Sequence, residues 1–184
     1  MGGREVNHEI DIHLDWSGPF KFADACRSND NGDWGVYQIY GSHPLYGAEV
    51  LLYIGKAERR TFGARLPEPH SMPYCYAIES TTVYLGRLAG EVAPDDAEWN
   101  RRIVLAESLL ITAHRPAWNS QMNAHKLDAE LQGVHIFNWG NHRCLMPEVS
   151  GARWTSRLNT MEHYHVFKAE EPRTSPASPT GKDS

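Results

Sequence analysis

The stretch VLLYIGKAERR changes from an apolar run to a cationic one within a few positions. The apolar part is typical of a buried strand, yet it places Tyr53 near the end of that strand. Three basic residues follow, namely Lys56, Arg59 and Arg60. Gly55 lies between Tyr53 and Lys56 and would let a backbone or a substrate come close. Because charged donors make strong hydrogen bonds to anionic oxygens, the stretch predicts a site that faces a phosphate or a phenolate.

A second chemically informative residue is Glu107, on a predicted long helix. At the angular spacing of an α-helix, Glu107 falls on the same face as four apolar residues, namely Trp99, Ile103, Leu110 and Ile111. A carboxylate on a core-facing surface is costly unless a hydrogen bond, a cation or a metal compensates it. The alternative interpretation is a residue at the edge of that face, which reaches solvent or pairs with an arginine.

The elements that must position these side chains follow from local patterns. Residues 10–16 alternate apolar and polar side chains, which is typical of a half-buried strand. Aromatic, β-branched and apolar runs predict further strands at 34–40, 49–55, 81–88, 134–139 and 163–168. A short helix is expected at 59–66, before Pro67. The long helix is expected from the capping pair Asp95 and Glu98 to His114, before Pro116.

Composition and charge narrow the class of protein. The chain has 184 residues, enough for one domain with extensions, and a formal net charge of −5. Residues 1–50 carry three basic against eight acidic side chains, whereas residues 51–168 carry thirteen against twelve. The acidic charge is thus concentrated near the N-terminus, and net charge neither supports nor excludes a phosphate-bearing partner.

Cysteine spacing and hydropathy bear on the compartment. Cys26, Cys75 and Cys144 are far apart and odd in number, so they form neither a CxxC metal site nor a disulfide framework. No apolar stretch approaches the roughly 20 residues of a membrane span, and the first residues lack a signal-peptide core. We therefore expect a cytoplasmic protein with no membrane partner. From Ala169 the composition predicts a disordered tail.

The ordered set of motifs resembles the GIY-YIG nuclease family. Gly35-Val36-Tyr37 supplies the first signature and Tyr53-Ile54-Gly55 the second, on consecutive predicted strands. The later elements follow in the family's order, namely Lys56, Arg65, Glu107 and Asn119. The resemblance covers about residues 33–121. It implies an α+β fold in which a small antiparallel β-sheet is flanked by helices, with N- and C-terminal extensions.

The resemblance also implies a chemistry, the divalent-metal-dependent hydrolysis of a DNA phosphodiester bond. Glu107 would hold Mg²⁺, for which Mn²⁺ could substitute, because Mg²⁺ takes oxygen ligands and keeps several waters. Arg65 would stabilise charge on the phosphate, and Asn119 would orient groups by hydrogen bonding. Tyr37 would accept the proton of the attacking water while Tyr53 positions water or phosphate, although these two roles could be exchanged.

A tyrosine base needs help from neighbouring charges. Lowering its pKa from about 10 to near 7 takes about 4 kcal/mol of preferential phenolate stabilisation, which Lys56, Arg65 and a metal together could supply. Arg65 lies slightly later than in the family's compact members, so Arg59 or Arg60 could take its place. His70 is a further catalytic candidate, since some restriction-type members use a histidine shortly after the arginine.

Four segments are expected along the chain. Residues 1–32 form an N-terminal extension with a strand, residues 33–121 the nuclease core, residues 122–168 a C-terminal extension packed on the core, and residues 169–184 the tail. DNA is the expected partner. A homodimer would be favoured for an enzyme that cuts both strands with one active site per subunit.

Several roles remain open at this stage. A type II restriction endonuclease is the first expectation, and a repair nuclease, a toxin nuclease or a non-catalytic DNA-binding module are the alternatives. Trp139, Arg143, Arg153 and Arg157 could contact DNA or form ordinary surface. His163 and His165 share one face of a predicted strand and could bind a transition metal, but a plain polar face explains them as well.

Overall fold

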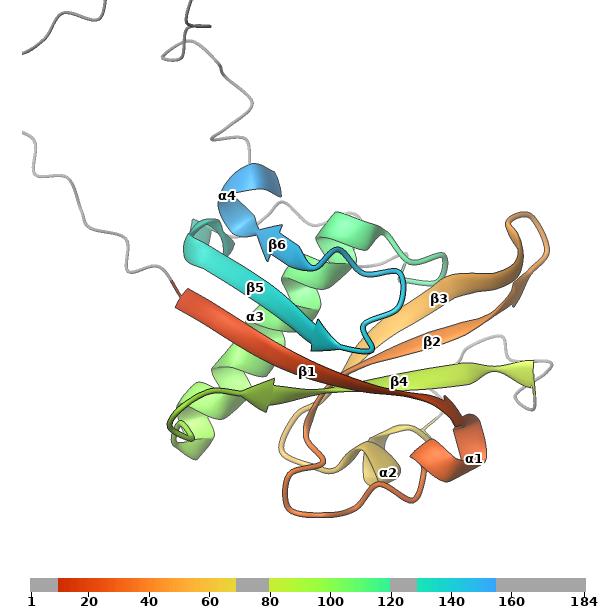
Figure 1. The fold of residues 1–184 in the computed structure, drawn as a ribbon, viewed down its shortest axis with the longest axis horizontal. Coiled ribbons are helices and arrows are strands. Elements are labelled where there is room, and N and C mark those ends of the chain that lie inside the picture. Colours follow the sequence, from red (N-terminus) through yellow and green to blue (C-terminus); the bar gives the residue numbers. More distant parts are fainter. Residues whose placement is uncertain (1–9, 69–79, 120–128, 155–184) are drawn as a thin grey trace, which may run out of the picture.

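The computed structural model describes residues 10–68, 80–119 and 129–154, which form an α+β fold around one sheet (Figure 1). The elements, in chain order, are β1 (Ile10–Lys21), α1 (Phe22–Ala25), β2 (Gly35–His43), β3 (Gly47–Ala57), α2 (Phe62–Arg65), β4 (Thr82–Ala89), α3 (Asp96–His114), the 3₁₀ helix η4 (Ala129–Gly133), β5 (Val134–Gly140), β6 (Glu148–Ser150) and α4 (Gly151–Trp154). The predicted α+β class is therefore confirmed.

The six strands lie in the order β3-β2-β4-β1-β5-β6. Neighbouring strands are antiparallel except β1 and β5, which run parallel from the pair Ile10 and Val134 to the pair Trp16 and Gly140. The expectation of a purely antiparallel sheet is wrong at this one pair. The chain between β1 and β5 includes three strands and α3, which gives it the length that a parallel connection needs.

Strand β1 lies inside the sheet. It pairs with β4 on one side, where Trp16 stands opposite Gly86, and with β5 on the other. The indole Nε1 of Trp16 also donates a hydrogen bond to Asn138 Oδ1 of β5, at 2.8 Å. The strand expected in an N-terminal extension therefore shares a sheet with the predicted core. The domain boundaries at residues 32 and 121 remain predictions.

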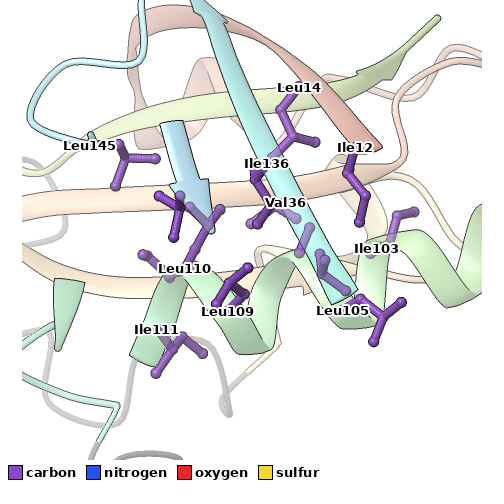
Figure 2. Packing of buried hydrophobic residues seen from close by; sticks show 14 of the residues in the cluster. Ile12, Leu14, Val36, Ile103, Leu105, Leu109, Leu110, Ile111, Ile136 and Leu145 are labelled. Atoms are coloured by element: carbon purple, nitrogen blue, oxygen red, sulfur yellow. The ribbon is translucent and has the colours of Figure 1, made fainter. Parts of the chain in front are cut away.

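Alternating side chains bury both faces of the sheet. On one face, α3 packs against β2, β3, β5 and β6. Ile12, Leu14 and Trp16 of β1 belong to the same core, as their spacing predicted, and Figure 2 shows Ile12 and Leu14 beside α3. On the other face, α1 and α2 cover a smaller cluster that includes Tyr37, Phe62 and Leu85. Edge strand β3 touches both cores, through Ile54 on the α3 side and Tyr53 on the other.

The two predicted helices differ in how well local signals placed them. The Asp95 side chain accepts a hydrogen bond from the Glu98 backbone N–H at 2.9 Å, and α3 ends at His114 before Arg115 in a left-handed conformation. The helix expected at 59–66 is confined to α2. The backbone N–H of Arg59 binds Asn100 Oδ1 of α3 at 3.2 Å, and Arg59 has a positive φ of 58°. A tertiary contact therefore delays the helix to Phe62.

Several predictions fall outside the described residues, namely those for residues 163–168, for the tail 169–184, for His70, for Cys75 and for Arg157. Within the described residues, Cys26 and Cys144 are free thiols. Among the helices of those same ranges, none combines the length and the apolar character that a membrane crossing requires.

The contact between β1 and β4 yields a stability prediction. A Cβ added at Gly86 would lie 2.8 Å from three ring atoms of Trp16, whose side chain is buried and hydrogen-bonded. Overpacking of this kind costs about 1–3 kcal/mol, so Gly86→Ala should lower the free energy of unfolding by that amount. Urea denaturation followed by circular dichroism measures it.

The matched control is Gly90→Ala, where the nearest neighbour of an added Cβ is 3.9 Å away. This variant should unfold at nearly the wild-type urea concentration. Equal midpoints for the two variants would contradict the packing of Trp16 against Gly86.

Candidate active site

Tyr37 and Tyr53 lie on the same sheet face at the β2–β3 edge. Their ring centroids are 6.1 Å apart, with an angle of 36° between the ring planes. Gly55 stands directly opposite Tyr37 in the strand pair. A Cβ on Gly55 would lie 2.5 Å from Tyr37 Oη and 2.6 Å from Tyr53 Cε1. The glycine therefore makes room for the two tyrosine rings.

Tyr37 is held by both its own strand and α2. Its ring meets Phe62 edge to face, with centroids 6.5 Å apart, and its side chain is fully buried. Gly35 at the start of β2 has a φ of +155°, and a Cβ there would lie 2.1 Å from the Gly86 carbonyl oxygen. The two glycines of the paired motifs thus permit close contacts that place Tyr37, while Tyr53 remains partly exposed.

Lys56 and Glu107 meet on the opposite face of β3. Lys56 Nζ lies 3.1 Å from Glu107 Oε2 and 3.6 Å from Glu58 Oε2. The Glu107 side chain is only 12% exposed. The prediction that a core-facing carboxylate needs compensation is confirmed, and the ion-pair partner is Lys56 of β3. The alternative interpretation was an ion pair with an arginine, whereas the cation that pairs with Glu107 is the Lys56 ammonium.

Burial and charge shift the acid–base behaviour of this group of side chains. Burial raises the pKa of Glu107; the Lys56 and Arg65 cations oppose that rise, and the Glu58 carboxylate adds to it. Burial also raises the pKa of Tyr53, as does the Glu107 carboxylate, while Arg65 lowers it. The net effect keeps Tyr53 protonated, so its hydroxyl can donate a hydrogen bond. The neighbouring cations do not make Tyr53 a phenolate.

Of the three candidate arginines, Arg65 lies closest to this site. Its Nε donates to the Lys56 carbonyl oxygen at 3.3 Å, and its guanidinium also contacts Glu68. Its charge lowers the pKa of both Tyr53 and Glu107. Arg60 pairs with Glu68, and the side chain of Arg59 is 78% exposed. The geometry favours Arg65 over the other two as the guanidinium of the site.

Asn119 holds the middle residue of the second motif. Its Oδ1 accepts from the Ile54 N–H at 2.9 Å, and its Nδ2 donates to the Ile54 carbonyl at 2.8 Å. The preceding Trp118 N–H binds the Leu52 carbonyl at 2.8 Å, so this segment extends the edge of β3. Asn119 is buried and positions the strand that carries Tyr53 and Gly55.

The side chains present suit a hydrated, weakly held divalent cation. Across residues 10–68, 80–119 and 129–154, no cluster of three or more His, Cys, Asp or Glu side chains could enclose a metal. Mg²⁺ commonly binds through one or two carboxylates and keeps its waters. Glu107 meets that requirement, although Lys56 already contacts one of its oxygens.

Sequence reasoning missed three residues around the site. Glu58 contacts Lys56, Glu68 contacts Arg65, and Asn100 binds the backbone beside Glu58. Glu58 could have been predicted as an ion-pair partner, because it lies between Lys56 and Arg59 in the sequence. Asn100 carried none, because its contact joins residues far apart in the chain.

The basic and aromatic C-terminal region contributes mainly to the fold. The Arg143 guanidinium lies 4.1 Å from the centre of the Tyr40 ring and contacts Glu49. Trp139 is half exposed and stacks against His13 and Phe137. DNA contact by these side chains remains a prediction, as does contact by Arg153.

No family model, curated protein or solved structure matches this chain. The resemblance drawn from the motifs therefore remains a prediction.

Replacing Asn119 tests its positioning role. Asn119→Ala leaves the buried N–H and carbonyl of Ile54 without their partner, which should lower the free energy of unfolding by about 1–3 kcal/mol. Urea denaturation measures the loss. Asn141→Ala is the control, because within the described residues its exposed side chain makes one hydrogen bond, to the Gly18 carbonyl. If the free energy of unfolding falls by the same amount in both variants, the hydrogen bonds of Asn119 do not stabilise the position of β3.

The raised pKa of Glu107 predicts how stability depends on pH. A carboxyl whose pKa is higher in the folded than in the unfolded chain stabilises the fold below its ordinary pKa, and this contribution disappears as pH rises through the folded pKa. Glu107→Gln cannot titrate. Its stability relative to wild type should therefore increase as pH rises above the ordinary carboxyl pKa of about 4, as urea denaturation at a series of pH values would measure.

Glu98→Gln on the same helix is the matched control. A hydrogen bond from Arg102 lowers the pKa of Glu98, so the wild-type carboxylate stabilises the fold at neutral pH and loses that advantage in acid. Relative to wild type, Glu98→Gln should become less stable as pH rises. Curves of the same sign for the two variants would contradict the assignment for Glu107.

Proposed function

We propose that this protein is a divalent-metal-dependent DNA endonuclease with a GIY-YIG active site. The observation that carries the proposal is the meeting of motif residues from four elements around edge strand β3. Tyr37 comes from β2, Tyr53 and Lys56 from β3, Arg65 from α2, and Glu107 from α3. Residues of these types, brought together from separate parts of the chain, can supply the proton acceptor, the metal ligand and the charge stabilisation that phosphodiester hydrolysis uses.

The charges assign a part to each side chain. Glu107 would hold Mg²⁺, which when bound supplies charge stabilisation for the leaving 3′-oxygen. The Arg65 guanidinium, fixed by Glu68 and the Lys56 carbonyl, would face the non-bridging phosphate oxygens. Outside this centre, the exposed Arg59 side chain and the partly exposed Arg60 side chain would contact flanking phosphates and place the DNA across β3.

The two tyrosines take different parts in the proposal. Tyr53 is partly exposed and stays protonated, so it would donate a hydrogen bond to the phosphate or to the attacking water. Tyr37, whose hydroxyl lies over Gly55 and is buried in the free protein, would accept the proton of that water once bound DNA brings the water within hydrogen-bond reach. This division keeps the general base separate from the group that positions the substrate. Exchanged roles would appear as exchanged effects of the two phenylalanine variants.

Plasmid cleavage tests the function. With Mg²⁺ or Mn²⁺ the purified protein should nick or cut supercoiled plasmid, and Glu107→Gln should abolish cleavage with the fold intact by circular dichroism. Tyr37→Phe should slow cleavage about 10²–10⁴-fold, the range for loss of a general base. Arg65→Lys should cost about 10²–10³-fold, the range for one preorganised charge-stabilising donor.

Arg60→Lys is the control for Arg65→Lys. Both variants exchange a guanidinium for an ammonium, but the Arg60 side chain is more exposed than that of Arg65. It should change the cleavage rate less than about tenfold, as expected of a surface contact. If neither the wild-type protein nor Glu107→Gln cleaves plasmid, single-stranded or branched DNA, the proposed endonuclease activity is wrong. A non-catalytic DNA-binding module would then be the remaining interpretation.

The cleavage products separate the biological roles. We propose a type II restriction endonuclease first, for which discrete plasmid fragments are expected. Broad degradation would instead support a toxin nuclease, and preference for branched or damaged DNA a repair nuclease. Light scattering with and without DNA would establish whether the active species is a homodimer.

A further inference from the structure

The ammonium group of Lys56 lies between two carboxylates. It is 3.1 Å from Glu107 Oε2 and 3.6 Å from Glu58 Oε2. Lys56 and Glu58 are each about one-third exposed, whereas Glu107 is more deeply buried. The lysine therefore has two partners, and the one nearer to solvent is not part of the motif that predicted the site.

The position of Glu58 is fixed by the helix that carries Glu107. The backbone N–H of the next residue, Arg59, donates to Asn100 Oδ1 at 3.2 Å. Asn100 is buried, and its Nδ2 donates to the Asp96 carbonyl at 2.6 Å. Asn100 lies about two turns before Glu107 on α3, so both residues occupy the same side of the helix. One rigid element thus places both carboxylates around Lys56.

A divalent cation at Glu107 would compete with Lys56. Two cations at the same carboxylate repel each other, and a partly buried ammonium that loses its only partner is costly. Glu58 removes that cost, because its carboxylate is already within ion-pair distance of Lys56 Nζ. A small rotation about the last bonds of the Lys56 side chain would move its ammonium from Glu107 to Glu58.

Resting on the proposed function, we propose that Glu58 is a positioning residue that takes over Lys56 when Glu107 binds a divalent cation. The contacts of Glu58 distinguish this role from that of a second metal ligand. Its Oε2 faces Lys56, and its Oε1 lies 3.8 Å from Arg59 Nε. Both oxygens therefore lie within ion-pair distance of a cation, which favours the role of a partner for Lys56 over that of a second metal ligand.

A double-mutant cycle on metal binding tests this role without any measurement of activity. Mn²⁺ is titrated into the ¹⁵N-labelled protein, and paramagnetic broadening of the amide signals around Glu107 gives an apparent affinity even where binding is weak. Glu58→Gln should weaken Mn²⁺ binding at least about twofold, since residues in contact couple by such amounts. Lys56→Met should strengthen Mn²⁺ binding, because it removes the competing cation.

The double variant decides between the two roles of Glu58. If Glu58 acts through Lys56, Glu58→Gln has no effect on Mn²⁺ affinity in the Lys56→Met background. If Glu58 were itself a metal ligand, Glu58→Gln would lower the Mn²⁺ affinity in both the wild-type and the Lys56→Met backgrounds, and that result would overturn the proposal. An unchanged Mn²⁺ affinity in the Glu58→Gln single variant would overturn it as well. Glu130→Gln, an exposed carboxylate on η4, controls for the loss of one negative charge and should leave the affinity unchanged.

Glu107→Gln separates this inference from the proposed function. It should remove the local broadening while the amide spectrum shows an intact fold. If Mn²⁺ binds in a manner that depends on Glu107 but not on Glu58, only the role of Glu58 is wrong. If broadening near Glu107 is absent in wild type or persists in Glu107→Gln, the proposed metal site is wrong and the role of Glu58 with it.

Discussion

The register between β2 and β3 is the constraint on which the candidate site depends. It sets Tyr37 opposite Gly55, where the absence of a side chain leaves space for both tyrosine rings. A slip of one residue would turn every side chain of β3 to the other face, moving Tyr53 into the α3 core and Lys56 away from Glu107. Asn119 holds the outer edge of the same strand through the backbone of Ile54, so the register is fixed from both sides.

Edge strand β3 also explains how one site draws on both faces of the sheet. At an interior strand, the neighbouring strands separate the side chains of the two faces. At an edge strand, long side chains from the two faces can approach each other past the open edge of the sheet. Tyr53 lies on the α2 side, and Lys56 meets Glu107 on the α3 side. The Glu107 carboxylate on the α3 side nevertheless raises the pKa of Tyr53, and the Arg65 guanidinium lowers it. Burial of the Glu107 carboxylate is unfavourable for the fold, and the ion pair with Lys56 compensates part of that cost.

Much of the fold could be predicted because its signals are local. The alternation of Ile12, Leu14 and Trp16 predicts a strand and its buried face, and Asp95 predicts the start of α3 through a hydrogen bond made within one turn. The same alternation carries no information about which strand lies beside β1, so its parallel pairing with β5 was missed. The helix predicted from Arg59 is shorter for a similar reason, since Asn100 binds the Arg59 backbone from a distant part of the chain.

For the candidate site, the sequence by itself determined the types of side chain and the faces on which they lie. Period-two and helical spacing follow from backbone geometry alone, which is why the strand that carries Tyr53 and the core-facing helix surface that carries Glu107 could be named in advance. The prediction that this strand ends just after Tyr53 is wrong, because β3 continues through Lys56 to Ala57. Only the tertiary structure decided the partners. Lys56 compensates Glu107 and also contacts Glu58, and Asn119 binds the backbone of Ile54. These contacts join residues whose separation in space is set by the packing of α3 and the order of the strands, and no local pattern encodes that distance.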